Sequence, residues 1–222
     1  MCPVGDQPLI DHALARFDGV TSAIAVNVHH GRALLESHLA GRVHLSVEER
    51  EPLGTAGALG NLRDWVAGRP VLVANGDTWC PSSIGVLLDG WDGERMRVLV
   101  HGSDVLTTRA SIAGALIPWS VTSTFEPVPS GLYELSWRAA SADGSLEVVT
   151  LDGSVPCVDC GTPADYLRAN LTWSGGESVI GPGAIVEGKV DESVVWPGAV
   201  VRPMERLYRA IRAHEHMTVV VR

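Results

Sequence analysis

Short apolar strands alternate with helical patterns along the first third of the chain, and this alternation restricts the fold more than any other feature of the sequence. Strands are expected at 23–28, 43–47 and 70–74. Helices are expected behind Pro8, at 32–39, and after the glycine-rich turn 54–60. The pattern predicts an α/β fold with a doubly wound, mostly parallel sheet, in which ligands bind beyond the carboxyl ends of the strands.

The middle of the chain carries weaker patterns of the same kind. Runs at 97–100, 112–117 and 155–159 are expected to be strands, and 131–142 is expected to be a helix. Thr162, Pro163 and Asp165 then supply an N-cap, a first-turn proline and a capping-box acid, which predicts a further helix.

After Gly175 the sequence changes to a short repeat. The segment 178–186 (SVIGPGAIV) is echoed by 193–201 (SVVWPGAVV), with turn-forming residues between aliphatic ones, as in hexapeptide β-helix coils. We therefore expect a core domain at 1–174 and a short left-handed β-helix tail at 175–222. Two copies are too few for an independently stable stack, so the tail is expected to pack against the core or against a second subunit in a homo-oligomer.

Composition limits the partners. The 222 residues are 45% apolar, enough to bury a core, and 17 basic against 26 acidic residues give a net charge of −9. This charge repels nucleic acid and anionic membranes, and no run approaches the ~18 apolar residues of a membrane span. The start has no signal-peptide pattern, so a cytoplasmic protein is expected. The Cys157/Cys160 pair is expected to be two small buried residues and not a metal or redox site.

The segment 51–59 (EPLGTAGAL) combines glycines with the expected start of a helix. Helix N-termini favour anions, and Gly54 and Gly57 would let a ligand approach the backbone. The spacing is not that of the dinucleotide fingerprint, and close packing of the helix is the alternative.

Two carboxylates follow predicted strands. Asp77 comes directly after 70–74 and Gly76, and Asp159 ends the run 155–159. Carboxylates at one sheet edge suit Mg²⁺, which prefers oxygen ligands and shares its shell with substrate phosphates. The alternative for each is an ordinary turn aspartate.

Three motifs in order, 51–59, 73–77 (VANGD) and 159–167 (DCGTPADYL), carry a resemblance. Together with 2–10 (CPVGDQPLI) and the repeats, they make the chain resemble the nucleotide-sugar pyrophosphorylases, also called sugar-1-phosphate nucleotidylyltransferases. The resemblance covers nearly the whole chain. It implies that a hexose-1-phosphate attacks a nucleoside triphosphate and releases pyrophosphate, with mannose-1-phosphate and GTP as the first expectation.

The resemblance also implies site residues. Asp77 and Asp159 would be catalytic and would hold Mg²⁺. Residues expected to contact the nucleotide are Glu51, Leu53, Gly54, Thr55, Gly57 and Gly76. Residues expected to contact the sugar are Gly114, Gly161 and Thr162.

The chain departs from the family pattern in two places. The family's first strand and its glycine-rich phosphate-holding loop are not found before Cys2, and only 101–111 stands where the family has a longer segment with Glu-Lys-Pro. We expect an N-terminally truncated core with impaired activity, because preorganised charge is a large catalytic term. The alternative is a non-catalytic regulatory subunit. A hexapeptide acyltransferase is disfavoured, since His214 and His216 follow the repeats and are expected at the surface.

Overall fold

The computed structural model describes residues 1–215 and 217–221, so His216 lies outside the described residues. The chain packs into two compact units. The first contains residue 1 with 16–75 and 82–154, and the second contains 2–15, 76–81 and 155–222. This division follows packing, and the boundary expected after residue 174 stays a prediction. No helix among the described residues is long and apolar enough to cross a membrane.

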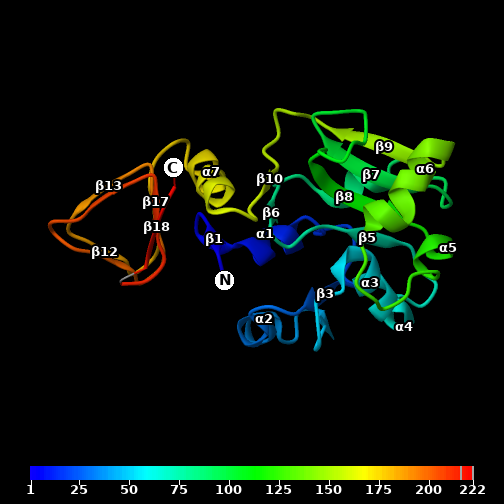
Figure 1. Ribbon diagram of the computed structural model, residues 1–222, viewed down its shortest axis with the longest axis horizontal. Coiled ribbons are helices and arrows are strands. Elements are labelled where there is room, and N and C mark those ends of the chain that lie inside the picture. Colours follow the sequence, from blue (N-terminus) through cyan, green and yellow to red (C-terminus); the bar gives the residue numbers. More distant parts are fainter. Residues whose placement is uncertain (216, 222) are drawn as a thin grey trace. The chain divides into compact units, whose positions relative to one another are not determined.

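The strands of the first unit form a parallel pair and a four-stranded sheet in the order β5-β8-β7-β9 (Figure 1). They are β3 (Ala25–Val28), β4 (His44–Val47), β5 (Val71–Val73), β7 (Met96–His101), β8 (Ile112–Ile117) and β9 (Leu146–Leu151). Strands β3 and β4 pair in parallel, as do β7 and β9. Strand β8 runs antiparallel to both of its neighbours, so the expected mostly parallel sheet is a mixed one.

The helices of the first unit are short. They are α2 (Arg32–Leu39), α3 (Gly54–Asn61), α4 (Arg63–Val66), the 3₁₀ helix η1 (Ile84–Leu88), α5 (Trp119–Thr122), the π-helical turn η2 (Tyr133–Trp137) and α6 (Arg138–Asp143). The helix predicted at 32–39 is confirmed. The one predicted at 131–142 is confirmed too, as the π-helical turn η2 that continues into α6. Strand β9 was not predicted.

One apolar cluster joins the helices of this unit to its sheet. Ala56 and Leu59 of α3 pack with Val98 of β7, Ile117 of β8 and Ala140 of α6. Val98 and Ile117 are fully buried. Every second residue of β7 from Met96 to Val100 belongs to this cluster, so one face of the sheet packs against α3.

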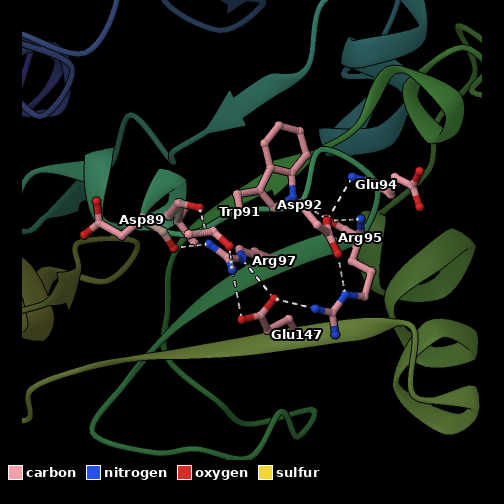
Figure 2. Close-up of polar contacts among 9 residues, drawn as sticks. Asp89, Trp91, Asp92, Glu94, Arg95, Arg97 and Glu147 are labelled. Carbon is pink, nitrogen blue, oxygen red and sulfur yellow. Dashed lines mark hydrogen bonds and ion pairs between the residues drawn. The ribbon is translucent and has the colours of Figure 1, made fainter.

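A buried arginine connects the strands to the end of η1 and the segment after it (Figure 2). Arg97 of β7 donates from Nε and Nη2 to the two carboxylate oxygens of Glu147 on β9, each over 3.0 Å. Its guanidinium also donates to the carbonyl oxygens of Leu87, Asp89 and Gly90. The Arg97 side chain is 6% exposed, so its hydrogen bonds connect the sheet to the η1 segment inside the protein.

The second unit holds the chain's beginning, a small ribbon and helix α7. Its elements before the tail are β1 (Pro3–Val4), β2 (Gln7–Pro8), α1 (Leu9–Ala15), β6 (Thr78–Trp79), β10 (Val158–Asp159) and α7 (Pro163–Trp173). The predicted cap of α7 is confirmed, because Thr162 Oγ1 accepts a hydrogen bond from the Asp165 amide over 3.1 Å. The strand predicted at 155–159 forms only at its last two residues.

The tail is built from short strands paired mostly in parallel. They are β11 (Val179–Ile180), β12 (Ile185–Val186), β13 (Lys189–Asp191), β14 (Val194–Val195), β15 (Val200–Val201), β16 (Arg206–Tyr208), β17 (Ala210–Arg212) and β18 (Thr218–Val220). The two repeat copies pair with each other, with Val179 opposite Val194 and Ile185 opposite Val200. Trp196 packs edge-on against Tyr166 of α7 at 6.4 Å between ring centroids, which fixes the tail to that helix.

Candidate functional site

Asp77 and Asp159, far apart in sequence, lie at one antiparallel ribbon of the second unit. Strands β6 and β10 pair with Asp159 opposite Thr78. The Cys160 amide extends the pairing by donating to the Asp77 carbonyl oxygen over 2.9 Å. The sequence placed Asp77 after the strand expected at 70–74, which in the structure is β5 and pairs with β8. Asp77 instead lies just before β6, and β6 is the strand that pairs with β10 and so brings Asp77 close to Asp159.

The two carboxylates influence each other electrostatically. Burial raises the pKa of Asp77 above its ordinary value, and the negative charge of Asp159 raises that pKa further. Asp77 keeps solvent access all the same. Two carboxylates that repel each other at an accessible ribbon are an arrangement that a divalent cation would relieve.

Asp159 is also part of the turn that starts α7. Its Oδ1 accepts a hydrogen bond from the Gly161 amide over 2.9 Å. A Cβ added to Gly161 would lie 3.1 Å from that same oxygen. Gly161 and Thr162 are exposed, and the Gly161 amide holds the Asp159 carboxylate near the beginning of the helix. Their role in binding a sugar stays a prediction.

The donor set suits magnesium better than zinc. Over residues 1–215 and 217–221 there is no group of three or more His, Cys, Asp and Glu side chains placed to hold a metal ion. Magnesium is commonly held by one or two carboxylates, with water and substrate phosphate completing its shell. Asp77 and Asp159 fit that requirement.

The glycines of α3, in the first unit, have a packing role. A Cβ on Gly54 would lie 2.6 Å from the Ser130 carbonyl oxygen, and one on Gly57 would lie 2.2 Å from that of Val128. Gly54 also has a φ of +67°, which favours glycine. The packing explanation left open by the sequence therefore holds for these positions, and nucleotide contact stays a prediction.

The backbone before these glycines is fixed by a residue that the sequence did not single out. The Leu53 amide donates to Oε2 of Glu48 over 3.0 Å. Glu48 is 5% exposed, whereas Glu51, the acid expected near the nucleotide, is exposed. Ser46 and Glu48, two residues apart on and just after β4, are both buried, and the sequence itself does not distinguish Glu48 from the acidic residues beside it.

Gly114 and Gly76 are explained by close contacts as well. Gly114 lies in β8, where an added Cβ would come within 2.9 Å of Ile84 Cδ1 and 3.1 Å of the Val73 carbonyl oxygen. A Cβ on Gly76 would meet Ile10 Cδ1 at 3.2 Å. Gly114 belongs to the first unit with the glycines of α3, and Gly76 belongs to the second with the two aspartates.

Comparison with solved structures identifies the fold. A Bacillus anthracis protein, provisionally named a glucose-1-phosphate thymidylyltransferase and solved with a sucrose, matches 77% of this chain and 84% of its own with a TM-score of 0.59 at 19% identity. HddC from Yersinia pseudotuberculosis matches 78% of this chain and 88% of its own with a TM-score of 0.61 at 17% identity. The chain shares their fold. HddC solved with GMP-PN gives a TM-score of 0.58 at 16% identity, over 78% of this chain and 88% of that one. No protein-family model and no curated protein matches the chain.

Proposed function

We propose that this protein is a sugar-1-phosphate nucleotidylyltransferase, which forms a nucleoside diphosphate sugar and pyrophosphate from a nucleoside triphosphate and a hexose-1-phosphate. The observation that carries the proposal is the placement of Asp77 and Asp159 at one ribbon, where Asp159 lies opposite Thr78 and its negative charge helps raise the pKa of Asp77. The shared fold with a protein named for this chemistry supports it. Fold alone does not define function, so the two carboxylates carry most of the weight.

In the proposed reaction, a phosphate oxygen of the sugar phosphate forms a bond to the α-phosphorus, and the bond to the bridging oxygen of pyrophosphate breaks. Asp77 and Asp159 would hold Mg²⁺ through their carboxylate oxygens. The ion would supply charge neutralisation for the phosphates. The reaction needs positioning and charge compensation more than a side-chain base, which agrees with a site built from two carboxylates.

The remaining predicted contacts complete the proposal. Glu51, Leu53, Gly54, Thr55, Gly57 and Gly76 would contact the nucleotide, and Gly114, Gly161 and Thr162 the sugar. We favour GTP and mannose-1-phosphate as the first pair to test and glucose-1-phosphate next. The HddC structure with GMP-PN supports testing guanine nucleotides first.

The tail has a separate proposed role. The parallel pairing of its two repeat copies supports a short left-handed β-helix. Such a stack leaves its end strands open, so we propose that it joins copies of the chain into a homo-oligomer.

Pyrophosphate release tests the proposal. The chain is incubated with Mg²⁺, each of the common nucleoside triphosphates, and mannose-1-phosphate or glucose-1-phosphate. Release that needs both substrates and is lost in Asp77→Asn and Asp159→Asn, but not in the exposed control Asp191→Asn, is the expected result. Nucleotide binding without any release would favour a regulatory subunit instead.

A further inference from the structure

Glu48 is a buried carboxylate just beyond β4 with both oxygens engaged. Its Oε2 accepts from the Leu53 amide over 3.0 Å, and its Oε1 accepts from Asn27 Nδ2 over 3.0 Å. The neighbouring Glu49 differs completely, since its side chain is 77% exposed and lies 3.7 Å from Arg32. Burying a carboxylate destabilises the folded state unless hydrogen bonds satisfy it, so the two hydrogen bonds of Glu48 compensate for its burial.

These bonds link three elements at one point. Asn27 belongs to β3, Glu48 follows β4, and Leu53 directly precedes α3. Leu53 has no side-chain cap bond at the helix start. The chain's entry into α3 is thus held by the carboxylate of Glu48.

The other side of Leu53 is held by the segment before η2. The Ser130 amide donates to the Leu53 carbonyl oxygen over 2.8 Å, and the Ala56 amide donates to the Ser130 carbonyl oxygen over 3.1 Å. Leu53 therefore has its N–H fixed by Glu48 and its C=O fixed by Ser130. Gly54 and Thr55 follow directly and begin the helix, so these two hydrogen bonds of Leu53 fix the backbone just before their amides.

We propose that Glu48 is a positioning residue for nucleotide binding: by holding the Leu53 amide, it aims the amides of Gly54 and Thr55 at the ligand. This inference rests on the proposed function, in which the same segment receives the nucleotide. Glu48 itself touches no substrate. Groups that position a ligand act through small displacements, and these can change binding or rate by tenfold or more.

Three substitutions separate this role from simple stability. Glu48→Gln keeps an oxygen for the Leu53 amide, and its amide group can donate to Asn27 once that side chain flips. Glu48→Asp keeps the charge but is one methylene too short to reach Leu53. Glu48→Met removes both bonds and keeps the volume. Glu49→Met is the matched control, because it removes the same charge at an exposed neighbouring position.

The experiment combines nucleotide titration with hydrogen exchange at the Leu53 amide. GTP and the other nucleoside triphosphates with Mg²⁺ are titrated into the wild type and each variant, and KM and kcat are measured wherever turnover occurs. We expect Glu48→Asp and Glu48→Met to weaken nucleotide affinity about tenfold. KM should rise more than kcat falls, and the Leu53 amide should exchange faster. Glu48→Gln and Glu49→Met should resemble the wild type.

The outcomes distinguish this inference from the proposed function. A wild type that binds no nucleotide contradicts the proposed function. Hydrogen exchange at the Leu53 amide then reports only on its hydrogen bond to Glu48. A wild type that binds nucleotide, with Glu48→Asp binding equally well, overturns the positioning role. Should Glu48→Met fail to fold, the Asp and Gln variants decide, because Gln keeps the reach to Leu53 without the charge and Asp keeps the charge without the reach.

Discussion

The Cys160 amide donates to the carbonyl oxygen of Asp77 over 2.9 Å, and this bond extends the ribbon in which Asp159 lies opposite Thr78. Two carboxylates separated by a large part of the chain thereby share one small piece of structure. The raised pKa of Asp77 follows from this arrangement, since both burial and the charge of Asp159 disfavour its ionised form.

Asp77→Asn should make the protein more stable at neutral pH. The folded pKa of Asp77 is raised, so the folded state holds its proton more tightly than the unfolded state does, and stability falls as pH rises through the folded pKa. Above the folded pKa, the ionised carboxylate of Asp77 destabilises the folded state, and an uncharged amide at this position removes that destabilisation. Thermal unfolding should show a higher Tm for the variant at pH 7 and a smaller difference near pH 4. An equal or lower Tm of Asp77→Asn at pH 7 would contradict a raised pKa for Asp77.

Magnesium should stabilise the wild type through the same two carboxylates. A ligand that binds only the folded state at 100 times its Kd adds about 2.7 kcal/mol. Tm is measured with and without Mg²⁺ in the wild type, in Asp77→Asn and in Asp191→Asn. We expect the shift in the wild type and in Asp191→Asn, and its loss in Asp77→Asn. A shift that persists in Asp77→Asn would place the ion elsewhere.

Gly57→Ala should destabilise the first unit by about 2 kcal/mol, because a Cβ overpacks a closed contact. That atom would lie 2.2 Å from the Val128 carbonyl oxygen. Gly153→Ala is the control, since its nearest neighbour would be an ordinary contact at 3.4 Å. Denaturant unfolding of both variants checks the difference. Equal midpoints would show that the backbone around Val128 shifts to accept the added Cβ without loss of stability.

Arg97→Met should cost roughly 3 kcal/mol of stability, because Glu147 and the carbonyl groups in and after η1 lose the guanidinium that donates to all of them. The control is Arg95→Met, whose side chain is 53% exposed, pairs with Asp92 and lies 3.7 Å from Glu147 (Figure 2). Exposed pairs contribute little, so this variant should unfold like the wild type. Chemical denaturation compares the two, and equal losses would contradict a stabilising role for the buried hydrogen bonds of Arg97.

Cysteine labelling should single out Cys2. Burial raises the pKa of Cys160 to about 11, so little thiolate forms there at neutral pH. Cys80 and Cys157 are buried, and Cys2 is exposed. Maleimide treatment at pH 7 followed by mass spectrometry should therefore modify Cys2 first. Early modification of Cys160 would show that its environment is more open than the structure indicates.

The sequence predicts features that depend on neighbours along the chain. Thr162, Pro163 and Asp165 define the start of α7 by themselves, and the cap forms as expected. The sequence also placed Asp159 at the end of a strand, where it lies in β10, but it placed Asp77 after a strand, whereas the structure has it just before β6. The repeat was also visible along the chain, and its two copies lie side by side, with Val179 opposite Val194.

Features that depend on distant partners were missed. Strand β9 forms because it pairs with β7, about 50 residues earlier, with Glu147 opposite Arg97. The glycines of α3 are needed because the backbone around Val128 packs on them, which no local pattern indicates. Glu48 sits in an acidic run with Glu49 and Glu51, and only burial separates it from them.

A double-mutant cycle on turnover tests the central claim most directly. The pyrophosphate release rate is measured for the wild type, Asp77→Asn, Asp159→Asn and the double variant at saturating substrates and Mg²⁺. If both carboxylates hold one ion, each single change removes most of the activity, and the double variant loses little more. Full activity in either single variant, or losses that simply multiply in the double variant, would contradict a shared ion.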